Sequence, residues 1–414
     1  MVFNYKKWLN IALINLLLVT FLGVIMRYKI GFDFPYLHQK HLQHAHSHFA
    51  FSGWIGHTLM VLLIRFLAIK TPQFYFKKYE KLLWMNLISS YGMLLFFTLQ
   101  GYAALSIFFS TLSIVVAYYF TILFWRDSQE LNTIAVYWFK GALFFNVISS
   151  LGTFALAYMM MSKNIHQELY LAAIYYYLHF QYNGWFFFVC AGLLMDYLNS
   201  KGIYFSKNKL WFRIFFTACI PAYFLSVLWL KLPVSVFVLT VLSAFVQVVV
   251  WFLFLQQIKK YKNIIVNDNN RILRSLYWFL GFAISVKLLL QLGSTIPEVS
   301  HLAFGFRPIV IAYLHLVLLA IISLFLLFYI YNNTLLPLSN SALQGLVVFF
   351  LGVLLNELVL GLQGVLSLAY IPIPYVNEIL FGIALMLLSG IFLQIMAMKK
   401  DKKKCDYDFT HKKT

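Results

Sequence analysis

Histidine is concentrated in one short stretch of this chain. Six of the 11 histidines lie between residues 38 and 57, at the start of a long apolar run; they are His38, His41, His44, His46, His48 and His57. Histidine is the commonest metal ligand in proteins, and an ionisable side chain at membrane depth is costly enough to indicate a function. The stretch therefore predicts a metal or cofactor site.

His46 has the neighbours that a haem ligand needs. On an α-helix, His46, Ala50, Gly53 and His57 share one face. The small residues Ala50 and Gly53 leave a flat slot in which a haem can lie against an axial imidazole. The alternative is that they serve only the close packing of helices within a membrane.

A zinc site is the rival interpretation of the same stretch. His44 and His48 are four residues apart and could chelate one metal ion at the outer surface of the membrane. The stretch contains no Cys, however, and the nearest acidic residue is Asp33, so a closed structural zinc site is not expected. His57 is either a buried, hydrogen-bonded histidine or a second cofactor contact.

The histidines belong to a chain that is apolar almost throughout. It is 62% hydrophobic and 11% charged, whereas a soluble domain carries about 25% charged residues. Apolar runs of about 20 residues, each long enough to cross a bilayer as a helix, recur along it. The prediction is an all-α polytopic membrane protein with one transmembrane domain over 1–398 and a basic tail over 399–414. The twelve predicted spans are 8–27, 43–69, 82–101, 104–125, 138–161, 169–196, 211–230, 234–257, 273–294, 307–331, 342–366 and 375–397.

The net charge of +19 follows the predicted topology. With the N-terminus inside, 25 of the 32 Lys and Arg residues fall on the inner side, six fall outside, and Lys287 lies within a span. Such a bias places both termini in the cytoplasm, as in a multi-pass protein of the inner (cytoplasmic) membrane. The charge therefore indicates a lipid bilayer as the partner, and nucleic acid is not expected.

Three histidines are predicted at similar depth. His46, His179 and His315 lie in spans two, six and ten, which all run from the outside to the inside. At about 1.5 Å per helical residue, each lies roughly 10–20 Å below the start of its helix. The sequence therefore predicts that the three converge on one intramembrane site.

The segments around these histidines resemble subunit I of the haem-copper oxidase and nitric oxide reductase superfamily, a family with twelve spans. The segment Ala45-His46-Ser47-His48-Phe49-Ala50-Phe51-Ser52-Gly53-Trp54 resembles the family's span two, in the C-type oxidase and nitric oxide reductase branches. The segment Ala312-Tyr313-Leu314-His315-Leu316-Val317-Leu318 resembles span ten. The resemblance implies that His46 and His315 are axial ligands of a low-spin haem, with His44 or His48 as substitutes for His46. It also implies that His179, followed by Asn183-Gly184-Trp185-Phe186, matches a copper ligand of span six.

Departures from the family's pattern fall in its oxygen-reducing centre. Tyr313 stands where the ligand of the high-spin haem is expected, and residues 211–230 contain no histidine for copper. Tyrosine does ligate haem iron in some proteins, but copper with a single imidazole is doubtful. The resemblance therefore implies a bis-histidine haem without the usual gas-reducing centre. No Cys-x-x-Cys-His motif occurs, so we expect haem b.

Three other polar residues near the membrane have two interpretations each. Arg307, at the outer end of span ten, suits a haem propionate or is an ordinary interfacial arginine. Lys287 either meets a propionate or extends to the membrane surface. Glu357, within span eleven, either takes part in proton movement or is paired locally, through Asn356.

The expected function is that of a membrane haem protein that transfers electrons or senses redox state or nitric oxide. A quinol or a cytochrome is the expected electron donor, and partner subunits are possible. The first alternative is an active terminal oxidase or nitric oxide reductase with a divergent centre. The second is a non-haem, metal-handling membrane protein that uses the outer histidines.

Overall fold

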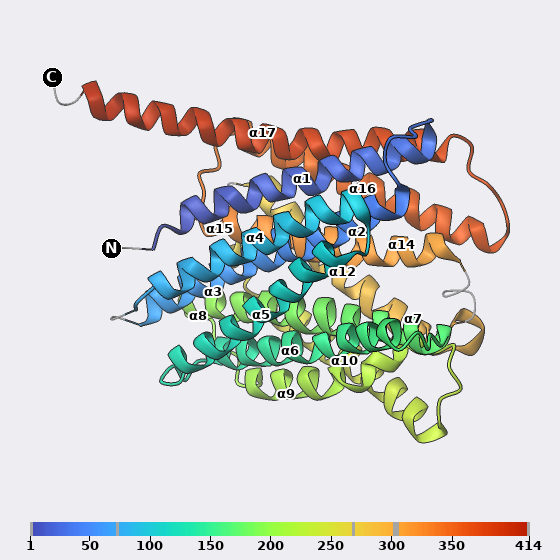
Figure 1. The fold of residues 1–414 in the computed structure, drawn as a ribbon. Coiled ribbons are helices and arrows are strands. Elements are labelled where there is room, and N and C mark those ends of the chain that lie inside the picture. Colours follow the sequence, from blue (N-terminus) through green and yellow to red (C-terminus); the bar gives the residue numbers. More distant parts are fainter. Residues whose placement is uncertain (1–2, 72–73, 267–269, 301–305, 412–414) are drawn as a thin grey trace. The chain divides into compact units, whose positions relative to one another are not determined.

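The computed structural model describes residues 3–71, 74–266, 270–300 and 306–411, with side-chain surroundings given through Lys399. The structure is 84% helical, and the described residues form no strand (Figure 1). At least ten helices are long and apolar enough to span a membrane. The predicted fold class, an all-α polytopic membrane protein, is confirmed.

The helices fall into two compact units. Unit 1 comprises residues 1–116, 326–366 and 371–414, and unit 2 comprises 117–325 and 367–370. The helices of unit 1 are α1 (Tyr5–Gly31), α2 (Gln39–Phe49), η1 (Ala50–Gly56), α3 (His57–Lys70), α4 (Lys77–Gln100), α15 (Leu324–Asn332), α16 (Asn340–Leu368) and α17 (Val376–His411). Helix α5 (Ala104–Asp127) begins in unit 1 and ends in unit 2. The helices of unit 2 are α6 (Ile134–Met161), α7 (Gln167–His179), η2 (Phe180–Phe186), α8 (Phe187–Ser200), α9 (Asn208–Cys219), η3 (Pro221–Val227), α10 (Val234–Lys259), α11 (Lys262–Ile265), α12 (Arg271–Gly293), α14 (Arg307–His315) and η4 (Leu316–Ser323).

The predicted spans are helical, although they differ in hydropathy. Ten described helices meet the length and hydropathy expected of a span, and an eleventh forms if α9 and η3 are counted as one bent span. That pair bends by 42°, next to Pro221, which has no N–H to donate within a helix. The predicted span 169–196 is covered by the consecutive helices α7, η2 and α8. Its tyrosine, glutamine and asparagine side chains make it less apolar than the others.

Helices α1 and α17 lie side by side and run in opposite directions in unit 1 (Figure 1). Tyr28, near the end of α1, contacts Phe381, near the start of α17, with ring centroids 5.5 Å apart. The N-terminal end of α1 and the C-terminal end of α17 are therefore at the same end of unit 1. An even number of spans requires this arrangement, whereas the cytoplasmic location of both termini stays a prediction.

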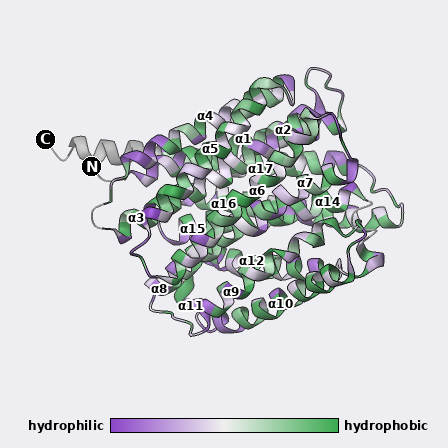
Figure 2. Cartoon of the chain, turned by 60° about the horizontal axis from the view of Figure 1, so that its bottom comes forward, coloured by the Kyte–Doolittle hydropathy of each residue, from purple (hydrophilic) through white to green (hydrophobic). Residues whose placement is uncertain are grey.

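Hydrophobic residues make up most of the length of the helices, and hydrophilic residues gather towards helix ends and connections (Figure 2). Glycine brings some helices close together. A Cβ on Gly345 of α16 would lie 2.6 Å from the carbonyl oxygen of Gly390 in α17, and one on Gly390 would lie 2.6 Å from the nitrogen of Phe349. Small residues at such contacts are typical of helix packing in membranes, where close backbone approach replaces the hydrophobic effect.

Among the residues that the structure describes, three segments are π-helices, which the sequence did not predict. They are η1, η2 and η4, of seven, seven and eight residues. The π-helix accounts for well under 1% of residues in proteins and is frequent at functional sites. Segment η2 begins directly after His179, η4 begins directly after His315, and η1 begins four residues after His46. The three helices singled out by their histidines are therefore the three that contain π-helical segments.

Candidate functional site

His46 lies in α2, half-buried, with its ring beside α1. A Cβ on Gly23 of α1 would be 3.8 Å from Cε1 of His46, which is ordinary van der Waals contact. The predicted slot beside it is only partly open. Ala50 is half-buried, but a Cβ on Gly53 would lie 2.8 Å from Cε2 of Phe49. The phenyl ring of Phe49 therefore fills the space that Gly53 leaves on that side.

Amide side chains from two other helices stabilise the π-helical segment η1. Asn15 of α1, fully buried, donates from Nδ2 to the carbonyl oxygen of Gly53 at 2.6 Å, and Tyr91 Oη donates to Asn15 Oδ1 at 2.7 Å. Asn86 of α4 donates to the carbonyl oxygen of Ser52 at 3.1 Å. Wider helical turns misalign the usual i→i−4 bonds. The Ser52 carbonyl accepts from the backbone N–H of His57, five residues later, and also from Asn86.

His57 follows directly after η1, at the start of α3. Its ring is fully buried, its Nδ1 lies 3.4 Å from Asn86 Nδ2, and it packs against the indole of Trp8 with ring centroids 5.8 Å apart. Because the π-helix has more residues per turn, the α-helical spacing that put His57 on the face of His46 no longer applies across η1. The surroundings are those of a packed, hydrogen-bonded histidine.

His44 and His48 pack against aromatic side chains. His48 stacks on Phe97 with ring centroids 4.4 Å and planes 8° apart, and its Nε2 lies 3.2 Å from Tyr102 Oη. His44 meets the edge of the Tyr102 ring at 4.6 Å. The rings of His38 and His41 lie 4.6 Å apart. Within the part of the chain that the structure describes, no three His, Cys, Asp or Glu side chains form a group able to hold a metal ion.

His315 ends α14 in unit 2, half-buried. Its Nδ1 lies 2.8 Å from the carbonyl oxygen of Ile311, one turn earlier. A carbonyl accepts only from N–H, so this bond places the proton on Nδ1 and leaves the lone pair of a neutral ring on Nε2. A backbone carbonyl commonly fixes metal-binding histidines in this tautomer.

Two other residues singled out from the sequence, Arg307 and Tyr313, precede His315 in α14. Arg307 is exposed in the first turn of the helix. Tyr313 contacts Tyr182 of η2, with ring centroids 6.4 Å apart and planes at 71°. The hydroxyphenyl group of Tyr313 thus packs on another tyrosine of unit 2.

His179 has the opposite tautomer. Its Nε2 lies 2.9 Å from the carbonyl oxygen of Cys219, so the proton is on Nε2, and Nδ1 accepts from Asn183 Nδ2 at 3.1 Å. The Cys219 carbonyl is available because the N–H of Tyr223, its α-helical partner, bonds to Ile220 instead. His179 therefore satisfies a carbonyl that the bend between α9 and η3 leaves unpaired, and both of its nitrogens are used.

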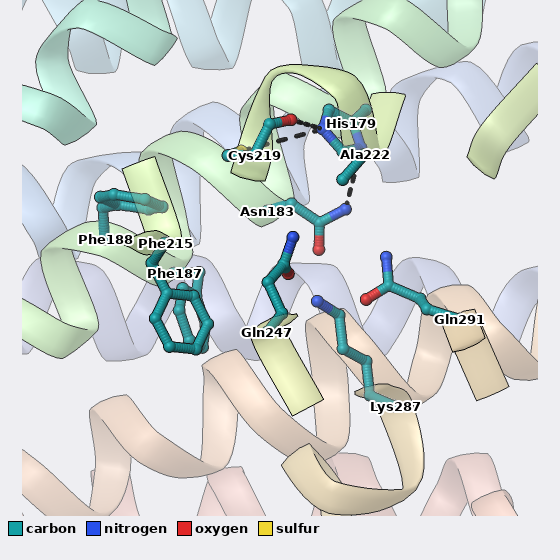
Figure 3. Close-up of a pocket in the computed structure, with 10 residues that line it drawn as sticks. All are labelled: His179, Asn183, Phe187, Phe188, Phe215, Cys219, Ala222, Gln247, Lys287 and Gln291. Carbon is teal, nitrogen blue, oxygen red and sulfur yellow. Dashed lines mark hydrogen bonds between the residues drawn. The ribbon is translucent and has the colours of Figure 1, made fainter. Parts of the chain in front are cut away.

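A buried polar cavity lies beside His179 in unit 2 (Figure 3). The residues that line it come from α7, η2, α8, α9, η3, α10 and α12. They are His179, Asn183, Phe187, Phe188, Phe215, Cys219, Ala222, Gln247, Lys287 and Gln291. The space between these atoms, including its open part, is about 280 Å³. Its enclosed part has room for about one water molecule. A haem does not fit there, so the cavity suits a small ligand.

Lys287 is the charged residue of this cavity. The side chain is 5% exposed, and its Nζ lies 5.7 Å from the centre of the Phe187 ring. Figure 3 shows it directed into the cavity beside Gln247, so it does not extend to the membrane surface. Among the described residues, no carboxylate pairs with its ammonium group.

Copper does not fit the donors around His179. The cavity offers one imidazole whose two nitrogens are already hydrogen-bonded, and Cys219 Sγ lies 3.8 Å from Nε2. The ammonium group of Lys287 lines the same cavity. A copper ion needs several nitrogen or sulfur donors, and a fixed positive charge opposes a second cation. The two predicted haem ligands, in contrast, belong to separate units: His46 to unit 1 and His315 to unit 2.

Sequence reasoning missed part of the cavity. Lys287 and its neighbour Gln291, one turn apart, stand out as polar residues within an apolar run. Gln247 and Cys219 were not selected, although a glutamine in the middle of a span is a usable signal. A search of protein-family models and a search of characterised proteins found no match to this chain.

Proposed function

We propose that this multi-pass membrane protein binds a low-spin b-type haem, with His315 and His46 as its axial ligands. Its function would be electron transfer, or the sensing of redox state or nitric oxide, in the cytoplasmic membrane. A quinol or a cytochrome would supply the electrons. The proposal begins from the resemblance of the segments around His46 and His315 to haem-copper oxidase subunit I.

The observation that carries the proposal is the hydrogen bond between His315 Nδ1 and the carbonyl oxygen of Ile311, at 2.8 Å. It selects the tautomer whose Nε2 lone pair a haem iron requires. His179 offers a comparison within the same unit, because its Nε2 donates a proton to Cys219. Of these two histidines, His315 has the protonation of a ligand and His179 has that of a structural residue.

The π-helical segments add support for the helices that carry His46 and His315. A π-helix weakens the regular hydrogen bonding of a helix and is retained mostly where function requires it. In this chain such segments follow His46, His179 and His315, and Asn15 and Asn86 hold the first of them in place. This placement is independent of the sequence motifs from which the haem was predicted.

Residues of the chain have defined roles in this proposal. A bound haem supplies one-electron transfer. His46 and His315 would hold the haem iron, which favours electron transfer over gas reduction. Arg307, exposed at the start of α14, would pair with a propionate. The half-buried Ala50 would limit the bulk beside His46.

An active terminal oxidase or nitric oxide reductase is the second candidate, favoured only by the tyrosine at position 313. Tyrosine is a haem ligand in some enzymes, so Tyr313 could in principle hold a second iron. The hydrogen bonds of His179 and the charge of Lys287 oppose a copper ion beside it. An electron-transfer or sensing role is therefore the better supported one.

Reduced-minus-oxidised spectra of the purified full-length protein test the proposal. We expect about one b-type haem per chain, with its Soret band lost in His315→Ala and in His46→Ala. His48→Phe is the matched control, because it keeps the ring stacking on Phe97 and should keep the haem. Absence of haem from the folded wild-type protein would reject the proposal. Two haems with gas consumption would favour the oxidase, and stoichiometric zinc or copper without haem would favour a metal-handling protein.

A further inference from the structure

The cavity beside His179 contains more hydrogen-bond donors than acceptors. The ammonium group of Lys287 carries three N–H bonds, and Gln247 Nε2 carries two and has no hydrogen-bond partner. Asn183 Oδ1 is an acceptor without a partner. Figure 3 shows these three side chains and Gln291 turned towards one another from η2, α10 and α12. The polar groups of Lys287, Gln247 and Asn183 therefore point towards one another.

All four polar side chains are buried. Lys287 is 5% exposed, Gln247 is 7% exposed, and Asn183 and Gln291 are each 8% exposed. Phe187, Phe188 and Phe215 form the apolar wall of the cavity. Burying an amide or an ammonium group in an apolar environment is unfavourable unless the group is hydrogen-bonded or paired with an opposite charge. Such a group therefore indicates that something completes the site.

The sign of the local charge identifies the class of ligand. Lys287 brings a positive charge, and no acidic residue lines the cavity. A bound water would bring two donors along with its two acceptor lone pairs and no charge, whereas an anion brings acceptor capacity alone and the missing negative charge. The enclosed space has the size of about one water molecule, which suits a halide better than a phosphate or a larger oxyanion.

We propose that this cavity binds one small monovalent anion of halide size, held by the ammonium group of Lys287 and the amide of Gln247. The remaining N–H groups of Lys287 and Gln247 face Asn183 and Gln291 across the cavity. The site does not depend on the proposed haem, because its residues belong to α10, α12 and η2 and include neither His46 nor His315.

Thermal unfolding of the full-length protein in detergent is the first test. Chloride or bromide should raise Tm in a saturable manner relative to gluconate at equal ionic strength, because gluconate is too large for the cavity. Lys287→Met should abolish this rise. Lys140→Met is the matched control, since Lys140 is another lysine of unit 2 and lies over Trp125, away from the cavity. A rise that is absent in the wild type, or equal in Lys287→Met, overturns the proposal.

A second variant keeps the test decisive if Lys287→Met fails to fold. Gln247→Glu preserves the shape of the side chain and adds a carboxylate where the anion is proposed. This variant should have a higher Tm than the wild type in gluconate and should no longer respond to halide. A variant that still responds to halide, or that is less stable than the wild type in gluconate, contradicts the assignment.

Anomalous scattering from crystals grown in bromide locates the ion directly. We expect one peak in the cavity, within contact distance of Lys287 Nζ and Gln247 Nε2, and its absence from crystals of Gln247→Glu. Density for a water molecule alone, or for a carboxylate of a bound cofactor, without a bromide peak overturns the proposal.

Discussion

Replacing Asn15 by leucine should destabilise the protein through the π-helical segment η1. Asn15 is fully buried and connects three helices: its Nδ2 donates to Gly53 at 2.6 Å, and its Oδ1 accepts from Tyr91 at 2.7 Å. Leucine has a similar volume and removes both bonds. The carbonyl of Gly53 and the hydroxyl of Tyr91 then lose these partners.

The expected cost follows from those two bonds. Each buried hydrogen bond contributes about 1 kcal/mol net, and a buried group left without a partner costs about 1–3 kcal/mol. Within membranes the average is lower, about 0.6 kcal/mol per bond. We therefore expect Asn15→Leu to lower the free energy of unfolding by about 2–4 kcal/mol.

Asn10 provides a matched control on the same helix. Its Oδ1 is buried and has no hydrogen-bond partner, so Asn10→Leu should be neutral or slightly stabilising. The free energy of unfolding can be measured by titrating the protein from mixed micelles into SDS. If Asn15→Leu falls within about 0.5 kcal/mol of Asn10→Leu, the proposed stabilisation of η1 by side-chain amides is refuted.

A double-mutant cycle separates the two bonds of Asn15. Tyr91→Phe removes only one hydroxyl and should cost about 0.6–1 kcal/mol. Adding it to Asn15→Leu should cost almost nothing more, because its acceptor has already gone. The coupling free energy should therefore be about 0.6–1 kcal/mol, and a coupling of zero would show that Tyr91 is stabilised by something else.

Two further predictions concern packing. Gly390→Ala should destabilise by about 1–3 kcal/mol, since its Cβ would meet the backbone of Phe349 at 2.6 Å. Gly382→Ala, on the same helix with nothing within 4 Å of the added carbon, should be neutral or stabilise by up to about 1 kcal/mol in the same SDS titration; equal costs would contradict the close approach of α16 and α17. His48→Ala should lose about 0.5–1.5 kcal/mol from its stacking on Phe97. His48→Phe should lose little, and a requirement for imidazole at this position would instead indicate a ligand role.

The fold was predictable because hydropathy alone determines where a helix can cross a membrane. Each apolar run became a helix, and the composition excluded a soluble domain before any contact was known. The segment from Gln167 to Ser200 has a weaker hydropathy signal than the other spans, because it contains tyrosine, glutamine and asparagine. It is nevertheless helical from end to end. These polar residues are also the ones that line the interior of unit 2.

The candidate site was less predictable, because its geometry depends on partners far away in sequence. The π-helical form of residues 50–56 relies on Asn15 and Asn86, which come from α1 and α4. The tautomer of His179 depends on a carbonyl that Pro221 helps to release. Local sequence identifies the histidines, but only tertiary contacts decide which nitrogen holds the proton. The resemblance to an oxidase subunit therefore predicted candidate residues without distinguishing ligands from structural histidines.

The π-helical segments change how these helices can vary. Each residue that a π-helix adds to a turn rotates the rest of the helix by about 100° relative to an unbroken α-helix. The halves of helix 39–70 on either side of η1 are thus out of phase, and a single deletion within Ala50–Gly56 would turn every residue of α3 to a new neighbour while leaving His46 unmoved. A π-helical segment therefore allows one half of a span to face a ligand while the other half packs against neighbouring helices. Insertions and deletions are expected to cluster at these π-helical segments among relatives of this chain.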